Sequence, residues 1–355
     1  LGHVSFDSWT SMLRVLPDMV RLKSYRTVYG LVSSFIRDPR LRIVLSFHPL
    51  LVGGNPFATT SIYCLIAFLE RRWGVHFVMG GTGRLVDGMV GLIAGQGNRL
   101  RLNAEVSRID VVAGKAAGVV LTSGERIDAA IVVSNADSAW TYRHLVAPQW
   151  RKRWTNRKIE KARYSNSLFV WYFGTRRQYP DVAHHTILLG PRYRELLDDI
   201  FTSKRLAEDF SLYLHRPTAT DPSLAPAGCD AFYVLSPVPH LGSGTDWNQV
   251  AERYRKAIER ALSDTLLPGL EFEIATSRIL TPQDFHDRLN SINGAAFGLE
   301  PVLTQSAYFR PHNKSEEVEN LFLVGAGTHP GAGLPGVLSS ARVLDGIVPD
   351  ARQSR

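Results

Sequence analysis

The feature that most restricts the fold is a glycine-rich loop near the C-terminus. Residues 321–324 are apolar and predict a buried strand, residues 325–336 hold five glycines in twelve positions, and residues 337–347 have helical spacing. Backbone amides of such a loop and of the first helical turn favour electron-rich oxygens of a ligand, because a helix start carries a partial positive charge. The segment therefore predicts a ligand-binding strand, loop and helix.

The literal pattern GxGxxG at residues 331–336 does not by itself identify a primary dinucleotide fingerprint. These glycines do not follow the strand directly, and only 19 residues come after Gly336, too few for a second strand and its ribose-binding acid. We expect a loop that closes over a cofactor held mainly by an earlier segment. A glycine-rich turn without a ligand is the alternative.

The N-terminal stretch predicts basic amphipathic helix. Apolar residues recur at three- and four-residue steps from Trp9 to Arg42, and Pro17 is expected to bend or divide the helix. Basic residues outnumber acidic ones here, which suits an element that lies on anionic lipid, although a solvated face of a core helix is the alternative. The formal charge of +8 permits an anionic partner, but interleaved aromatic and basic motifs for nucleic acid are lacking.

In the middle of the chain the spacing of apolar residues changes from that of a helix to that of strands. An extended piece at 76–79 precedes a glycine turn and a helix, and 106–133 predicts a three-stranded meander whose last strand enters a sheet covered on both faces. The run 62–69 predicts a buried helix. Over 137–289 the sequence predicts antiparallel strands with helices packed on one side. The aromatic-rich strands are expected at 167–173, 210–215 and 231–237, and the helices at 192–200 and 247–265.

Several classes of protein are excluded. Cys64 and Cys229 are too far apart for a zinc cage or a disulfide framework. No window reaches the roughly 18 apolar residues of a transmembrane helix. Metal sites are not expected, because His184 and His185 are sequence neighbours without metal-binding periodicity and the other histidines are scattered.

Leu321–Val337 (LFLVGAGTHPGAGLPGV) resembles the C-terminal flavin signature of the bacterial-type carotenoid phytoene desaturases. The resemblance runs from about Met12 to Gly346. Five further segments are similar to the same family: SFHPLLVGGNPFAT (46–59), AHHT (183–186), GPRYREL (190–196), EDFSLYLH (208–215) and EPVLTQSA (300–307).

The resemblance implies an FAD enzyme that introduces double bonds into phytoene, with hydride transfer to flavin, proton loss from the neighbouring carbon, and reoxidation by oxygen or quinone. It implies a cytoplasmic protein in peripheral contact with the inner face of the cell membrane. A polyene substrate requires a long apolar tunnel, for which the aromatics at 171–173 and 308–309 are candidates, with plain core as their alternative. A flavin amine oxidase, another carotenoid desaturase or saturase, and a lipid or carotenoid carrier are alternative functions.

Residue by residue, the resemblance implies an adenine contact at Val106 and flavin contacts in the C-terminal loop. The loop contacts are Gly325, Ala326, Gly327, Thr328, Gly333, Leu334, Pro335, Gly336 and Val337. No catalytic acid or base is assigned, because abstraction from an allylic carbon requires only weak proton acceptance. The weak candidates are Arg14, His48, the His184–His185 pair and His329.

The family opens with a strand and a GxGxxG loop, whereas Leu1–Phe6 already resembles its second quarter. We therefore expect an α/β fold: a Rossmann-like FAD-binding domain without its first βαβ unit, interleaved with an α+β substrate domain and a helical membrane-contacting segment. The expected divisions are 1–75 (helical segment), 76–136 (FAD domain), 137–300 (substrate domain) and 301–355 (FAD domain). We expect the chain by itself to be an N-terminally truncated fragment that binds FAD poorly and is inactive.

Overall fold

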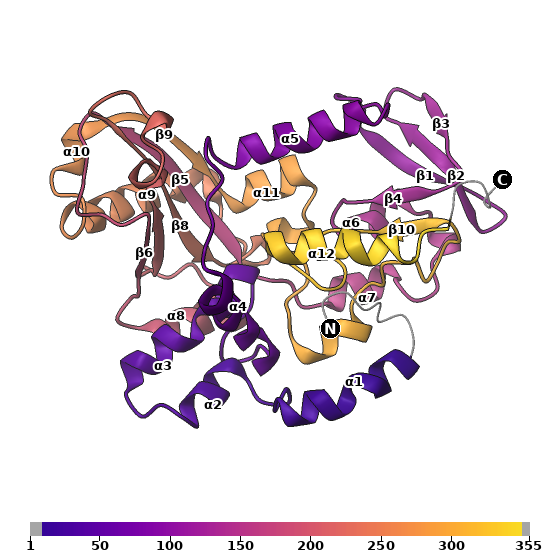
Figure 1. Cartoon of the computed structure of the whole chain (residues 1–355), viewed down its shortest axis with the longest axis horizontal. Helices are drawn as coiled ribbons and strands as arrows, with labels where there is room; N and C mark the ends of the chain where they lie inside the picture. The colour runs from indigo at the N-terminus through magenta and orange to yellow at the C-terminus, as the bar shows by residue number, and fades with distance from the viewer. Residues whose placement is uncertain (1–8, 350–355) are drawn as a thin grey trace. The chain divides into compact units, whose positions relative to one another are not determined.

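The computed structural model describes residues 9–349, and their contacts form two compact units (Figure 1). Unit 1 comprises Leu1–Trp73, Asn103–Asn166 and His286–Arg355, and unit 2 comprises Gly74–Leu102 and Ser167–Phe285. The borders expected above follow sequence order and stay a prediction. Leu1–Phe6, on which the truncation was inferred, lies outside the described residues.

Short helices form the N-terminal part of unit 1. They are α1 (Trp9–Arg21), α2 (Val28–Ser33), α3 (Pro39–Ser46) and α4 (Leu65–Trp73), with 3-10 turns at His48–Val52 and Ser61–Cys64. Pro17 lies inside α1 and does not divide it, contrary to one of the two expectations. The helix ends instead before Lys23, which has a φ of 55°.

The run 62–69 does form helix, but the expectation that it is buried is wrong. Leu65 and Phe68 are 52% and 55% exposed, and α4 has no buried residue among those described. An apolar run identifies a helix without identifying what covers it, since that depends on neighbouring elements.

The predicted meander of unit 1 is confirmed over 106–128, but its expected last strand, 126–133, is divided between two sheets. Strands β1 (Val106–Val112), β2 (Lys115–Leu121) and β3 (Arg126–Asp128) pair antiparallel in that order. Strand β4 (Val132–Ser134) then pairs parallel with β10 (Leu321–Leu323). The expectation that this strand is covered on both faces is wrong for Val133, which is 45% exposed because successive side chains alternate and the core packs on the other face.

The core of unit 1 surrounds β4 and β10. Leu321, Tyr142 and Ile159 are fully buried there, and the rings of Tyr142 and Trp154 stack at 5.9 Å. The helices α6 (Ser138–Trp140), α7 (Asn156–Lys161) and α12 (Leu334–Asp345) belong to this unit. Helix α12 begins three residues before the predicted 337, since Pro335 suits the first turn of a helix.

Unit 2 is built on a five-stranded antiparallel sheet of order β6-β7-β8-β5-β9. The strands are β5 (Ser167–Thr175), β6 (His185–Leu188), β7 (Leu212–His215), β8 (Asp230–Val238) and β9 (Ile274–Leu280). Its helices are α5 (Thr82–Gly95), α8 (Tyr193–Asp198), α9 (Trp247–Ser263) and α10 (Leu270–Glu273), and α11 (Pro282–Leu289) crosses the border between the units. The α+β prediction for 137–289 is confirmed in its antiparallel strands and its helices. The strand predicted separately at 76–79 does not form.

The two faces of this sheet differ. On one, Phe169, Trp171 and Phe173 are buried against α9, so the expectation that Trp171 and Phe173 line a tunnel is wrong. Tyr172, between them, points to the opposite face and is 42% exposed. There its ring lies 5.7 Å from that of Tyr233. We call the side chains of Tyr172, Tyr213, Tyr233 and Leu235 the open aromatic face.

Candidate functional site

The glycine-rich loop between β10 and α12 is held by side chains from elsewhere in unit 1. The amide of Gly325 donates to Ser340 Oγ at 2.8 Å, and the Ser138 hydroxyl donates to the carbonyl of Gly327 at 3.0 Å. The Thr328 hydroxyl, fully buried, donates to the carbonyl of Pro311 at 2.7 Å. These bonds fix the path of the loop.

Two positions in the loop require glycine. Gly325 has a φ of 97°, and a Cβ there would lie 2.3 Å from Asn135 Oδ1. Gly333, the N-cap of α12, has φ 94° and ψ 146°, a conformation that residues with a side chain rarely adopt. Gly333 has no side chain of its own to cover the backbone where the loop enters the helix.

The first turn of α12 has unsatisfied amides. Among residues 9–349 no side chain caps this turn, and Pro335 contributes no N–H. The amides of Leu334 and Gly336 are thus two of the donors that a helix start leaves without an intrahelical partner. Such donors bind anionic or electron-rich oxygens.

Arg310 supplies a buried positive charge beside the loop. It is 2% exposed, its Nη2 donates to the carbonyl of Ala326 at 2.8 Å, and its Nε has no hydrogen-bond partner among the described residues. Its guanidinium carbon lies 3.8 Å from where a Cβ on Gly331 would be. Burial lowers the pKa of Arg310, but a guanidinium stays charged at neutral pH.

The carboxyl of Asp137 lies near Arg310, but no ion pair joins the two side chains among the described residues. It caps α6, accepting from the amides of Ala139 at 2.8 Å and Trp140 at 3.0 Å. Burial raises the pKa of Asp137, while these amides and Arg310 oppose the shift. A buried cation with an unpaired N–H, beside bare glycine backbone and an uncapped helix, fits the electron-rich oxygens of a flavin cofactor.

The structure places the predicted flavin contacts as follows. Gly325 to Thr328 form the start of the loop, and Gly333 to Val337 form its end and the first turn of α12. Val106 begins β1 in the same unit and is half-buried. The roles of these residues stay predictions. Arg310 and Asp137 were missed because an isolated residue in an irregular segment carries no motif.

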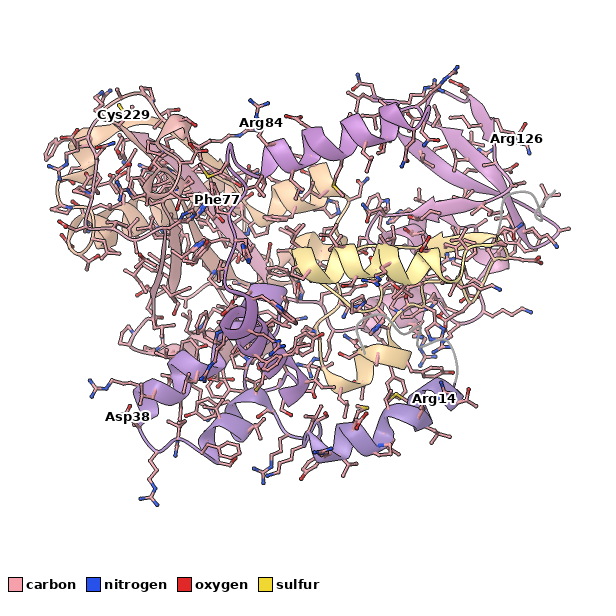
Figure 2. The ribbon with its side chains drawn as sticks, in the orientation of Figure 1. Arg14, Asp38, Phe77, Arg84, Arg126 and Cys229 are labelled. Carbon is pink, nitrogen blue, oxygen red and sulfur yellow. The ribbon has the colours of Figure 1, made fainter. Side chains whose placement is uncertain are left out.

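Three of the weak acid or base candidates lie on separate elements of unit 1, and the fourth, the His184–His185 pair, lies at the start of β6 in unit 2. Arg14 is exposed on α1 (Figure 2). His48 is buried in a 3-10 turn with its Nε2 3.4 Å from Glu70 Oε2, and burial lowers its pKa while Glu70 opposes the shift. His329 lies in the loop, where its carbonyl accepts from Asn313 Nδ2 at 3.1 Å. Their catalytic roles stay predictions.

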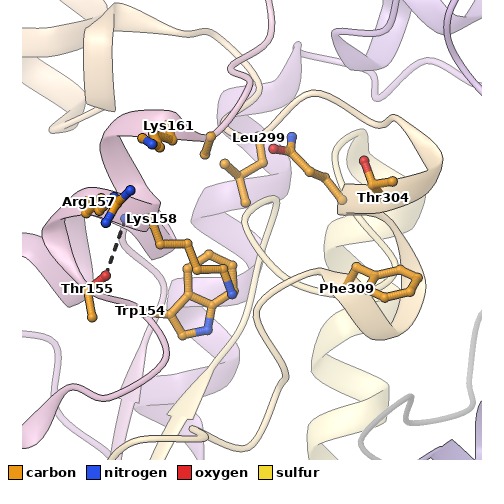
Figure 3. A pocket seen from close by; sticks show the side chains of 10 residues that line it. Trp154, Thr155, Arg157, Lys158, Lys161, Leu299, Thr304 and Phe309 are labelled. Carbon is orange, nitrogen blue, oxygen red and sulfur yellow. Dashed lines mark hydrogen bonds between the residues drawn. The ribbon is translucent and has the colours of Figure 1, made fainter.

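A hollow of about 510 Å³ elsewhere in unit 1 is basic in character (Figure 3). Arg157, Lys158 and Lys161 contribute to its lining, and the Lys158 ammonium lies 3.7 Å from the centre of the Trp154 ring. A polyene offers nothing for these cations to pair with, so the hollow does not match the apolar tunnel that the resemblance implies.

Comparison with known proteins relates nearly the whole chain to flavoenzymes. Residues 12–343 match the family described as flavin containing amine oxidoreductase. The lycopene-forming phytoene desaturase of Pantoea ananas is 51% identical over 349 residues, covering 98% of this chain and 71% of that protein. The neurosporene-forming phytoene desaturase of Rhodobacter capsulatus is 48% identical over 357 residues, covering 99% of this chain and 68% of that protein.

Solved structures of low sequence identity share the fold. An oxidoreductase from Methanosarcina mazei superposes with a TM-score of 0.64 at 17% identity, covering 96% of this chain and 73% of that chain. A putrescine oxidase superposes with a TM-score of 0.60 at 11% identity, covering 95% and 68%. These likenesses concern the fold alone.

Proposed function

The chain belongs to the flavin containing amine oxidoreductase family and, within it, to the bacterial phytoene desaturases, and from this we propose that it is an FAD-dependent desaturase of phytoene or a closely related long polyene. The observation that carries the proposal is an identity of about one half to these desaturases over nearly all of the chain. Amine oxidation has weaker support, because the likeness to an amine oxidase is one of fold at 11% identity.

Bound FAD would supply the acceptor for the hydride removed from the substrate. The chain's own contribution is to hold and polarise it: the loop amides and the first turn of α12 donate to its oxygens, and Arg310 adds positive charge. A cation beside the loop favours an electron-rich group, because Arg310 is buried and water screens its charge only weakly. As electron acceptor we propose oxygen or a quinone.

The open aromatic face of unit 2 is the surface that we propose for the hydrocarbon. Tyr172, Tyr213 and Tyr233 present ring surface without a formal charge, which suits a substrate that has only apolar carbon to offer. The Tyr213 hydroxyl lies 2.6 Å from His185 Nδ1, so part of the polarity of this face is satisfied within the sheet.

Peripheral contact with the cytoplasmic face of a membrane is proposed from the helices of unit 1. No helix within residues 9–349 is long and apolar enough to span a bilayer. However, Leu13, Leu16 and Val20 are exposed on α1, where Arg14 and Arg21 supply positive charge. Such a helix lies in the interface of an anionic bilayer. Flotation with anionic but not with neutral liposomes is expected, and failure to float with either at any salt concentration contradicts the proposal.

The function is tested with protein expressed from its complete natural reading frame, saturated with FAD and given phytoene in liposomes. The expected product has more conjugated double bonds and absorbs at longer wavelength. Oxidation of an amine such as putrescine without conversion of phytoene would overturn the proposal.

A pair of variants tests the substrate surface. Tyr172→Ala removes ring area from the open aromatic face, whereas Phe272→Ala removes a ring that is 79% exposed on α10 of the same unit. Losing contact with one large apolar side chain removes roughly 1.5–3 kcal/mol of binding, so kcat/KM should fall about 10- to 150-fold for Tyr172→Ala and stay unchanged for Phe272→Ala. Equal effects of both variants contradict this placement of the substrate.

A further inference from the structure

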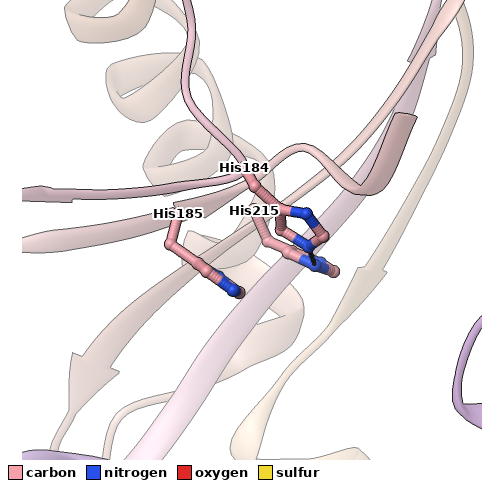
Figure 4. A group of neighbouring side chains, drawn as sticks. All are labelled: His184, His185 and His215. Carbon is pink, nitrogen blue, oxygen red and sulfur yellow. Dashed lines mark hydrogen bonds between the residues drawn. The ribbon is translucent and has the colours of Figure 1, made fainter. Parts of the chain in front are cut away.

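Three histidines of unit 2 come together through the pairing of β6 with β7 (Figure 4). His185 and His215 are directly opposite each other in this antiparallel pair, and His184 precedes β6. The amide of Arg216 donates to the carbonyl of His184 at 2.9 Å, which ties the two chain segments together behind the rings. The ligand nitrogens of the three rings all lie within 4.8 Å of one another.

Two of the rings are oriented by hydroxyl groups. His184 Nδ1 lies 2.5 Å from Thr220 Oγ1, and His185 Nδ1 lies 2.6 Å from the Tyr213 hydroxyl. If each Nδ1 carries the proton and donates it, each Nε2 keeps its lone pair. A partner on the second nitrogen is the usual arrangement around a histidine that binds a metal.

The third ring completes the group. His215 Nε2 lies 2.8 Å from His184 Nε2, and its Nδ1 is buried without a hydrogen-bond partner among the described residues. In the metal-free cluster one of these two Nε2 atoms donates its proton to the other, and a bound ion would replace this hydrogen bond. The unpartnered Nδ1 gives His215 a second place for its proton. The ring can carry its proton on Nδ1 and present Nε2 to an ion.

The surroundings keep the cluster uncharged. Burial lowers the pKa of all three histidines, and that of His215 falls to about 4 with its two neighbours adding to the effect. Phe77 and Tyr233 pack their rings against His184 and His215 at 4.7 and 4.5 Å. Neutral imidazoles are the form that binds metal, and three of them without a carboxylate suit Zn²⁺, Ni²⁺ or Cu²⁺ rather than Mg²⁺ or Ca²⁺.

We propose that His184, His185 and His215 form a binding site for one transition-metal ion of the Zn²⁺ class. Nitrogens around a tetrahedral zinc are about 3.4 Å apart, given a Zn–N distance of roughly 2.0–2.1 Å. The Nε2 atoms of His184 and His215, now 2.8 Å apart, must separate by about 0.6 Å to reach this value, and one ligand nitrogen from each of the three rings lies within 4.8 Å of the others. A fourth position on the solvent side remains for water. The ion cross-links the four-residue edge strand β6 to β7.

The test is a calorimetric titration of Zn²⁺ into untagged, metal-free protein in the absence of FAD. A single saturable site is expected, with no binding of Mg²⁺. His185→Ala should abolish saturable binding; because this side chain is exposed, the variant is expected to fold, and circular dichroism checks this. The matched control is His286→Ala, which removes a half-exposed histidine paired with Asp287 and should bind Zn²⁺ like the parent.

Tyr213→Phe tests the orienting hydroxyl, and its loss should weaken Zn²⁺ binding about 10- to 100-fold. The proposal is overturned if the parent protein binds no Zn²⁺, since the cluster is then only hydrogen-bonded, or if His185→Ala binds Zn²⁺ as tightly as the parent. Because the titration uses neither FAD nor a polyene, its failure is distinguishable from failure of the proposed desaturase function.

Discussion

Replacing Gly333 by alanine tests whether the loop conformation serves the cofactor. At φ 94° and ψ 146° a residue with a side chain is strained by roughly 1–3 kcal/mol. The new Cβ would also lie 3.2 Å from Val52 Cγ1, so that side chain must move by a few tenths of an ångström. If the strained loop is kept, the free energy of unfolding falls by this amount. If the loop relaxes to an unstrained conformation, FAD binding must restore the strained one, and the same free energy is lost from the binding of FAD.

The sum of the two losses is therefore the predicted quantity. A loss of roughly 1–3 kcal/mol in binding corresponds to a decrease in FAD affinity of about 5- to 150-fold. Gly228→Ala is the matched control, because Gly228 also has a positive φ (78°) but no atom of the described chain lies within 4 Å of its Cβ position. This control should lose about 1–2 kcal/mol of stability and no FAD affinity.

Both quantities are measured on protein expressed from its complete natural reading frame. Urea unfolding of the apoprotein gives the first loss, and quenching of flavin fluorescence during titration gives the second. The reasoning is refuted if Gly333→Ala changes neither stability nor FAD affinity by more than about 0.5 kcal/mol, the usual range of a neutral surface substitution. A loss of FAD affinity in Gly228→Ala would show that the effect is not specific to the loop.

Two further predictions concern buried polar groups of unit 2. Burial, with a smaller contribution from Lys204, lowers the pKa of His240 to about 4. Between pH 6.5 and 4 the unfolded chain therefore binds more protons than the folded chain. The free energy of unfolding consequently falls as the pH falls through this window. His240→Asn keeps an acceptor for the amide of Gly242 but does not titrate. Between pH 7.5 and 5, the free energy of unfolding measured in urea should fall by about 2 kcal/mol less in this variant than in the parent. An equal pH dependence of the two proteins refutes the prediction. Asp230→Asn breaks a buried pair with Arg216 (2.8 Å) and should lower the free energy of unfolding by about 3–5 kcal/mol, whereas a melting temperature like the parent's contradicts it.

The spacing of apolar residues and glycines predicted those helices and strands whose pattern is contained within a few neighbouring residues. The meander at 106–128 alternates around tight glycine turns, and α9 repeats its apolar positions at helical spacing, so both were identified. Strands β6 and β9 were missed, because an edge strand with polar residues such as Thr276 and Ser277 has no apolar pattern of its own. Tyr172 was grouped with its buried neighbours although it faces the opposite side of the sheet.

The sequence by itself determined the family, the cofactor and the glycine loop, since these depend on residues that are close together along the chain. Only the tertiary structure decided what lies around them. Arg310 becomes a buried cation because distant segments enclose it, and His215 joins His184 and His185 because β7 pairs with β6. The physical reason is that burial and the meeting of side chains arise from packing between segments, which the order of residues along one segment does not contain.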